Sequence, residues 1–268
     1  MGTTLVVEWR KTFTTRMWWV LLLVMVPYLA GFAAFIAFAF SAAPPAGAAA
    51  GAPTLDDPSV VTAVYGLAMP LGYVFPALVG ILAVTTEYRH KTITSTLLAE
   101  TRRPLVVLAK FSVAGVLGLV FGVVGVAAST GAGAAAVAAT GNPTLLSDPD
   151  VLASLARAAV GLAVWAMIGV AFGLVLRNQI AAIVSLLAFS QLVEPIARVG
   201  LGAFEATQSV ARLLPGAAGD ALTGSSVFAL QGGPVDLLSP WQGGLVLVAY
   251  ALVLGAIGTV GFVRRDVA

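Results

Sequence analysis

Six long stretches of apolar side chains dominate the sequence, and no other feature limits its fold so strongly. A helix needs about 20 mainly apolar residues to cross a lipid bilayer. We therefore predict an all-α polytopic membrane protein with six transmembrane helices, in a single domain over residues 1–268. The predicted spans cover residues 17–40, 63–86, 111–139, 152–176, 180–194 and 243–263.

The composition supports this fold class and argues against several functions. Charged residues make up 10% of the chain, whereas a soluble globular domain has about 25%. That shortage argues against a soluble enzyme, a nucleic-acid-binding module and a disordered protein. Cysteine is absent and His90 is the single histidine, so a thiolate or imidazole metal site is not expected. We predict that the chain is not an enzyme and binds no metal or nucleic acid.

The fifth stretch is short because it ends at Glu194-Pro195. Proline removes a backbone donor and disfavours helical geometry in the residue before it. The helix either stops at Glu194, which is the boundary we predict, or kinks and continues to Phe204. If it continues, Glu194 and Arg198 lie four residues apart and pair. Glu194, Pro195 and Arg198 are candidates for an outer gate, and an interfacial ion pair or helix cap is the alternative.

The distribution of basic residues predicts the orientation of the helices. If the N-terminus is cytoplasmic, all but three of the 14 lysines and arginines fall on the cytoplasmic side. The exceptions are Arg157, Arg198 and Arg212. Cytoplasmic loops carry an excess of Lys and Arg. We therefore predict a multi-pass protein of the cytoplasmic membrane with both termini in the cytoplasm.

Residues 1–16 have the pattern of an amphipathic helix next to the first span. A basic helix of this kind tends to lie in the plane of the lipid headgroups, anchored by tryptophan. The alternative is an ordinary charged flank with no mechanical role. The candidate residues of this helix are Trp9, Arg10, Lys11 and Arg16.

The segment between the second and third spans, residues 87–104, is the most charged part of the chain. Ile93, Leu97 and Leu98 have helical spacing, which predicts a short helix that offers apolar contact and charge to a neighbouring protein. The alternative is a basic anchor that touches only lipid headgroups. The charged candidates for the protein contact are Glu87, Arg89, His90, Lys91, Glu100, Arg102 and Arg103.

Small and ionisable residues within the spans carry further information. Glycines recur at three- and four-residue spacing in the third, fourth and sixth spans, which predicts close helix packing within the bundle or across a dimer.

Ionisable groups are nearly absent from the spans, whereas ion-coupled transporters usually bury some near the midplane. After the fifth span, an apolar series broken by Pro215-Gly216 predicts short re-entrant or outer helices.

Three stretches resemble the permease subunits of ABC-2 type exporters, the membrane half of ATP-binding-cassette transporters. The stretch after the second span resembles that family's coupling region, and the other two resemble its elbow helix and the outer segment before its last span. These stretches are Glu8-Trp9-Arg10-Lys11 through Arg16 to Trp18-Trp19, Thr86 to Ile93 continuing through Thr96-Leu97-Leu98 to Arg102-Arg103, and Leu213-Leu214-Pro215 with Gly219-Asp220-Ala221-Leu222.

The resemblance implies a six-helix permease with an elbow helix, a coupling helix after span two and broken helices before span six. It also implies that a separate ATPase subunit, in two copies, binds ATP and Mg²⁺, and that a second permease, identical or homologous, completes the transporter. The sequence agrees in containing no GxxxxGK[ST] phosphate loop. Export is implied by the family alone.

The expected mechanism is a population shift in which closure of the ATPases pushes on residues 87–104 and switches the permease between inward- and outward-open states. An apolar pathway suits a drug, antibiotic, lipid or peptide. Alternatives are an ion-coupled secondary transporter or channel, a membrane-embedded enzyme, and a purely structural subunit. The candidate pathway residues are Met69, Phe75, Ser185 and Phe189.

Overall fold

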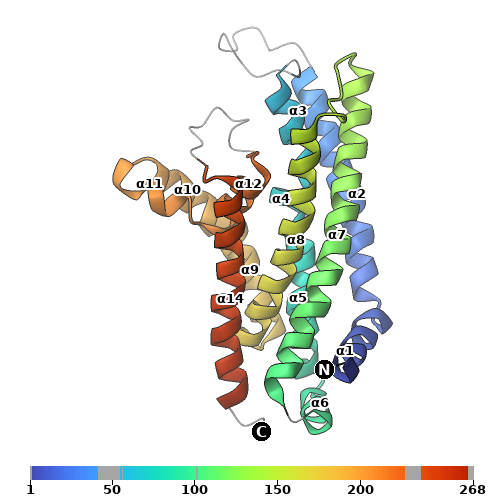
Figure 1. The fold of residues 1–268 in the computed structure, drawn as a ribbon, viewed down its shortest axis with the longest axis vertical. Coiled ribbons are helices and arrows are strands. Elements are labelled where there is room, and N and C mark those ends of the chain that lie inside the picture. The colour runs from blue at the N-terminus through green and yellow to red at the C-terminus, as the bar shows by residue number, and fades with distance from the viewer. Residues whose placement is uncertain (1, 42–54, 56, 101, 227–236, 265–268) are drawn as a thin grey trace.

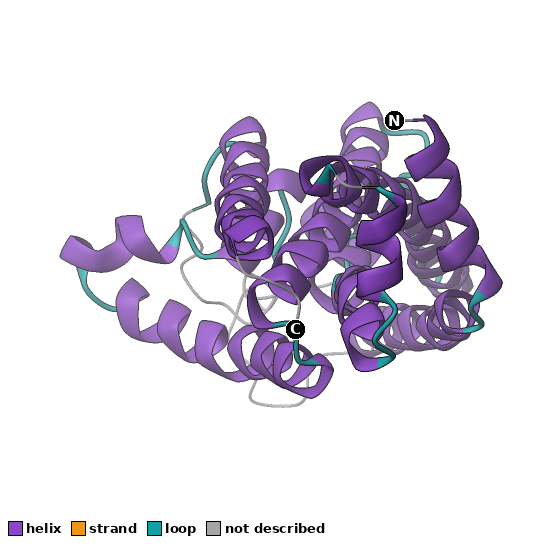
Figure 2. Ribbon diagram, turned by 90° about the horizontal axis from the view of Figure 1, so that it is seen from below, coloured by secondary structure: helices purple, strands orange, loops and turns teal. Residues whose placement is uncertain are grey.

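The computed structural model describes residues 2–41, 55, 57–100, 102–226 and 237–264. Within these ranges every regular element is a helix (Figures 1 and 2). The two chain ends lie at the same end of an elongated bundle (Figure 1), which we call the terminal end, and the opposite end is the distal end.

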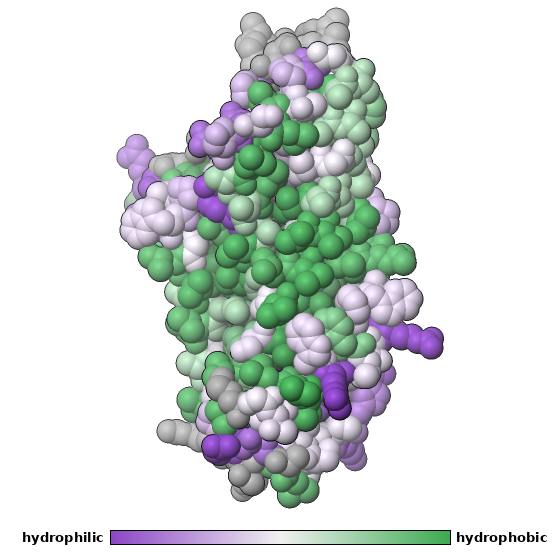
Figure 3. Space-filling model, turned by 45° about the vertical axis from the view of Figure 1, so that its right-hand side comes forward, coloured by the Kyte–Doolittle hydropathy of each residue, from purple (hydrophilic) through white to green (hydrophobic). Residues whose placement is uncertain are grey.

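Six helical segments of the described chain are long and apolar enough to cross a membrane, as the predicted all-α fold with six spans requires. On the face that Figure 3 shows, hydrophobic residues cover most of the middle, and most of the strongly hydrophilic ones lie nearer the two ends. The six segments are α2 (Met17–Ser41), α3 to α5 (Pro58–Tyr65, Ala68–Gly72 and Val74–Arg89), α7 (Arg103–Ala139), α8 (Pro149–Leu176), α9 to α10 (Gln179–Gly202) and α14 (Pro240–Arg264).

The fifth segment is longer than the predicted 180–194. It consists of α9 (Gln179–Ala188), a π-helical turn η1 (Phe189–Val193) and α10 (Glu194–Gly202). Pro195 lies in the first turn of α10, directly after the π-turn, and Val193 and Glu194 before it keep helical backbone angles. The chain therefore continues past the proline, which was the alternative to a stop at Glu194.

Four shorter helices accompany the spans, and each lies in a segment where the sequence predicts a short helix. A helix is present where the amphipathic segment was predicted, and another lies within residues 87–104. Between the fifth and sixth spans the described chain forms two helices that follow α10, which projects sideways from the bundle (Figure 1). These helices are α1 (Gly2–Thr14), α6 (Ile93–Ala99), α11 (Glu205–Ala211) and α12 (Pro215–Thr223). Their depth in a membrane remains a prediction.

Helix α8 lies at the centre of the bundle and packs against α5, α7 and α14. Its crossing with α5 depends on a reciprocal pair of glycines. A Cβ atom on Gly80 would overlap the carbonyl oxygen of Ala166, and a Cβ atom on Gly169 would overlap that of Ala77. Small residues let helix backbones approach this closely. Here the predicted glycine faces serve packing within one chain.

Candidate functional site

Four charged side chains form a buried network at the terminal end, which we call the terminal ionic cluster. The Lys110 ammonium donates hydrogen bonds to Glu8 Oε2 at 2.7 Å and to Glu87 Oε1 at 2.8 Å. The Lys11 ammonium donates to Glu8 Oε1 at 2.7 Å, to Glu87 Oε1 at 2.9 Å and to Thr96 Oγ1 at 2.9 Å. The network therefore joins α1, α5, α6 and α7.

The terminal ionic cluster is balanced in charge, with two carboxylates and two ammonium groups. The Lys110 side chain is only 1% exposed, whereas that of Lys11 is 36% exposed. Burial lowers the pKa of Lys11, but hydrogen bonds and charge from Glu8 and Glu87 outweigh this effect, so its pKa lies above the ordinary value. A space of about 10 Å³ remains beside the cluster, about the minimum for one water molecule.

The predicted coupling residues do not share one surface. Glu87 is 7% exposed and belongs to the terminal ionic cluster, and Ile93 is 3% exposed and packs in the core. Leu97 packs partly against the same core. Leu98, in contrast, is 78% exposed. Glu87 and Ile93 therefore turn inward, so neither side chain is available to a partner in this conformation.

The other charged residues of the segment 87–104 either bond to groups within the protein or are exposed to solvent. Arg103 donates to the carbonyl oxygen of Phe262 in α14 at 3.2 Å. Glu100 accepts hydrogen bonds from Thr4 Oγ1 at 3.1 Å and from Arg102 Nε at 3.2 Å. The Thr4 contact ties the C-terminal end of α6 to α1, and the Arg103 contact ties the start of α7 to α14.

Three further charged candidates of this segment are exposed. Arg89 donates a long hydrogen bond of 3.3 Å to Gln179 at the start of α9. His90 and Lys91 are exposed in the turn before α6, where Lys91 has a left-handed backbone with φ of 57°. The surface that the segment presents outward thus centres on Lys91, Leu98 and Arg102.

The four predicted elbow residues divide between the surface and the interior. Arg10 and Arg16 are exposed, and Trp9 is 42% exposed while it stacks on Phe13 with ring centroids 4.3 Å apart. Lys11 instead belongs to the terminal ionic cluster. Helix α1 is therefore held to the bundle by one of the charges that we expected to face the headgroups.

A second network, the distal ionic cluster, joins Glu194, Arg198 and Asp220. Arg198 donates to Glu194 Oε1 through Nε at 3.1 Å and Nη2 at 3.0 Å, and to Asp220 Oδ2 through Nη1 at 2.8 Å. Glu194 Oε1 also accepts the backbone N–H groups of Gly216 and Ala217 at 2.6 and 3.1 Å. Glu194 thus pairs with Arg198 and also caps α12, which are the two roles given as the alternative to an outer gate.

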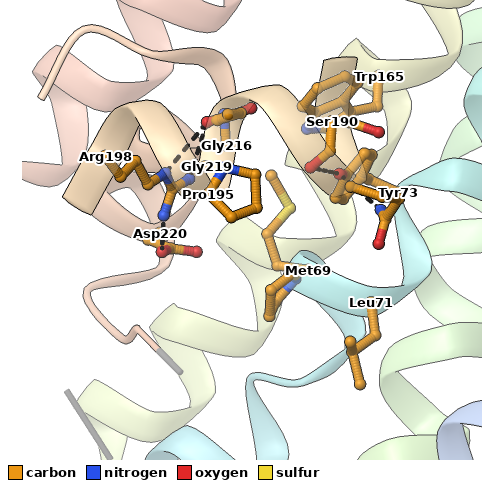
Figure 4. Close-up of a pocket in the computed structure, with 13 residues that line it drawn as sticks. Met69, Leu71, Tyr73, Trp165, Ser190, Pro195, Arg198, Gly216, Gly219 and Asp220 are labelled. Atoms are coloured by element: carbon orange, nitrogen blue, oxygen red, sulfur yellow. Dashed lines mark hydrogen bonds and ion pairs between the residues drawn. The ribbon is translucent and has the colours of Figure 1, made fainter. Parts of the chain in front are cut away.

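A cavity of about 170 Å³ lies next to the distal ionic cluster. Figure 4 shows Arg198 and Asp220 on one side of it and Tyr73 with Trp165 on the other. The two aromatic rings stack with centroids 4.2 Å apart. The π-helical turn contributes Ser190 to the wall, and π-turns inside helices are frequent at functional sites.

With this geometry established, comparison with known proteins gives no family for the chain. The sequence matches no protein-family model and no curated protein.

The four candidate pathway residues do not line a common space within one chain. Met69 lines the distal cavity. Phe75 packs against Tyr28 of α2, with ring centroids 5.8 Å apart. Ser185 is exposed on α9, and Phe189 is half-buried at the start of the π-turn. A shared pathway for all four would need a second chain.

Sequence analysis missed several members of the two clusters. Lys110 lies one residue before the predicted third span, yet α7 begins at Arg103 and buries it. The apolar run of residues 105–109 was the available signal. Asp220 was quoted only as part of the family resemblance, and Glu8 and Trp165 were not singled out for burial or binding. Among the described residues, no group of three His, Cys, Asp or Glu side chains is placed to hold a metal ion.

Proposed function

We propose that the chain is the membrane-spanning permease subunit of an ATP-binding-cassette transporter that exports an amphipathic or hydrophobic cargo. A separate ATPase, in two copies, binds ATP and Mg²⁺, and a second permease chain completes the pathway. The chain lies in the cytoplasmic membrane with both termini in the cytoplasm. Drugs, antibiotics, lipids and peptides are the cargo classes that an apolar pathway fits.

The observation that carries this proposal is the terminal ionic cluster. Through Lys11 and Thr96 it fastens α6 to α1, and through Glu87 and Lys110 it fastens both to the spans α5 and α7. A movement of α6 is therefore passed to α5 and α7 through charge-assisted hydrogen bonds of 2.7 to 2.9 Å. This connection is what a helix moved by a partner protein would need.

The partner surface in this proposal consists of the exposed residues of the segment. Lys91, Leu98 and Arg102 contact the ATPase, while Glu87 transmits the movement from inside. The ATPase must bind the two permease states with different affinity, because only a difference in affinity shifts the populations.

A second candidate, an ion-coupled secondary transporter, is favoured by one observation. Glu194 and Asp220 are each 2% exposed and lie beside a cavity with Arg198. Buried ionisable groups at a cavity are typical of ion or proton pathways. In the sequence alone such groups were nearly absent, because Asp220 lies outside the predicted spans.

Transport by purified protein in proteoliposomes separates the two candidates. The tagged chain is purified from its native membrane with any ATPase that accompanies it, and uptake of a panel of amphipathic dyes is measured. We expect uptake only when the ATPase, ATP and Mg²⁺ are present. Uptake by the chain alone under an ion gradient would overturn the proposal and support the second candidate.

Charge reversal on the exposed surface tests the coupling assignment. The double variant Leu98→Asp, Arg102→Glu leaves the terminal ionic cluster intact, and we expect it to lose the ATPase during purification. Glu205→Lys, a reversal of an exposed charge in α11 at the distal end, is the matched control and should retain the ATPase. Equal retention by both variants would contradict the assignment of this surface.

A further inference from the structure

The distal cavity is bordered by buried polar atoms that have no hydrogen-bond partner among the described residues. They are the indole Nε1 of Trp165, the hydroxyl of Ser190 and the second carboxylate oxygen, Oε2, of Glu194. These residues are 2%, 5% and 2% exposed, and all three line the cavity. Buried polar groups are nearly always bonded. Three unbonded groups around one space therefore indicate a polar ligand.

The bonding of Glu194 is one-sided. Four donors converge on Oε1: two from Arg198 and two from the backbone of Gly216 and Ala217. Oε2 has none. The carboxylate is thus held rigidly by one oxygen while the other remains able to accept a hydrogen bond.

The charges beside the cavity also favour a cation. Glu194 and Asp220 supply two carboxylates and Arg198 one guanidinium, and these are the ionisable carboxylate and basic groups in the described lining. Burial raises the pKa of Asp220, whose Oδ2 already accepts from Arg198, so Glu194 Oε2 is the carboxylate oxygen that a cationic donor would meet. Tyr73 and Trp165, which stack on each other, form an aromatic wall across the cavity from Arg198 and Asp220.

We propose that this cavity binds a small primary ammonium group with an oxygen atom beside it, as in an amino alcohol. The ammonium donates to Glu194 Oε2 and Ser190 Oγ, and the ligand oxygen accepts from Trp165 Nε1. The cavity of about 170 Å³ is well above the ~10–15 Å³ that one water molecule needs on the same measure, so it has room for a ligand of several non-hydrogen atoms. This inference concerns binding alone and is independent of an ATPase partner.

The ammonium group has two sources, a free amine or the headgroup of a lipid-like cargo, and the probes distinguish them. Binding of radiolabelled ethanolamine and of lyso-phosphatidylethanolamine is measured on the full chain in nanodiscs of phosphatidylcholine. We expect saturable binding of at least one probe, with choline and acetate as weak competitors. Choline lacks the N–H donors, and acetate has the wrong charge. Binding of the lyso-lipid alone assigns the ammonium to a lipid.

Two variants remove the unbonded atoms without breaking an existing hydrogen bond, although Trp165→Phe also replaces the indole with a smaller ring. We expect Ser190→Ala to weaken binding about tenfold, or ~1.4 kcal/mol, and Trp165→Phe to weaken it about fivefold. Ser190→Ala should melt at or above the wild-type temperature, because it removes a buried hydroxyl without a partner. A purely structural serine would give the opposite result, a lower melting temperature with unchanged binding.

Trp18→Phe is the matched control, since it also removes an unpartnered indole N–H, but from the terminal end. It should bind the probes like the wild type. Gly219→Ala gives an independent test, because a Cβ there would lie 2.7 Å from Met69 Cε and so narrow the cavity while leaving every charge in place. We expect it to weaken binding. Absence of saturable binding, or equal affinity in all variants, would overturn the proposal.

Discussion

The terminal ionic cluster contains two carboxylates and two ammonium groups, whereas the described charges of the distal ionic cluster are two carboxylates and one guanidinium. Beside the first, a space of about 10 Å³ is left, and beside the second about 170 Å³. Charges that are balanced and closely packed hold helices together. Charges that are unbalanced, with room beside them, suit a ligand. Acidic and basic side chains thus hold helices together in the terminal ionic cluster, whereas in the distal ionic cluster they lie beside a space that suits a ligand.

Removing the buried ammonium of the terminal cluster should have the largest effect. Lys110→Met leaves Glu8 and Glu87 without their most buried partner, and we expect a loss of about 3–5 kcal/mol in the free energy of unfolding. The measurement is unfolding in mixed detergent micelles, with the exposed Lys91→Met as control. Adding Glu8→Gln should recover part of the loss, because it restores the balance of charge. If Lys110→Met unfolds like the control, the cluster does not hold the helices together.

The corresponding change in the distal cluster should cost less. Arg198→Met leaves Glu194 and Asp220 without a cation, but the Arg198 side chain is 15% exposed and a cavity adjoins it. We expect a loss of about 3 kcal/mol, the lower end of the range for breaking a buried pair. The same unfolding assay applies, with Arg102→Met as control. A loss larger than that of Lys110→Met would remove the contrast between the clusters.

Lys11 should contribute less to the free energy of unfolding than Lys110 or Arg198. Its side chain is 36% exposed, so solvent screens its ion pairs with Glu8 and Glu87. We expect Lys11→Met to cost about 1 kcal/mol, near the top of the range for exposed ion pairs. Because the chain has no cysteine, Thr4→Cys gives a single label in α1 at a position 9% exposed. Maleimide labelling should be faster with Lys11→Met than without it. Unchanged labelling would show that Lys11 does not hold α1 in place.

The smallest expected effect is a pH dependence of the same contact. The pKa of Lys11 is raised in the folded protein, so its stabilisation is complete below the ordinary lysine value of 10.5 and is lost as the pH rises through the folded value. The difference in melting temperature between wild type and Lys11→Met should stay constant at neutral pH and shrink above about pH 10.5. A difference that shrinks already at neutral pH would contradict the raised pKa.

At acid pH we expect a separate dependence of the stability of the folded protein on Glu100. Backbone and side-chain hydrogen bonds from Arg102 lower its pKa below the ordinary 4.5. Its contribution is therefore present above pH 4.5 and is lost as the pH falls through the folded value. It should be small, because the carboxylate lies near solvent.

The number and type of the spans could be predicted from the sequence because membrane insertion is governed by a local sum. About 20 apolar residues in a row define a span whatever the rest of the chain does. The same holds for α1, in which apolar and charged residues are mixed, and for α6, in which Ile93 and Leu97 lie four residues apart. The fifth span shows the limit, since the sequence around Pro195 allowed both a stop and a continuation.

The partners of the charges were decided only by the tertiary structure. Lys110 meets a carboxylate 102 residues away, and Glu194 meets the start of α12, 22 residues further along the chain. Such contacts depend on which helices are neighbours and at what height they cross, and a shift of one helical turn, about 5.4 Å, would separate every pair. Hydropathy along the chain therefore determined that this protein has six helices long and apolar enough to cross a membrane. Packing of the helices determined where its charges are satisfied and where a cavity is left, because ion pairs act only over a few ångströms.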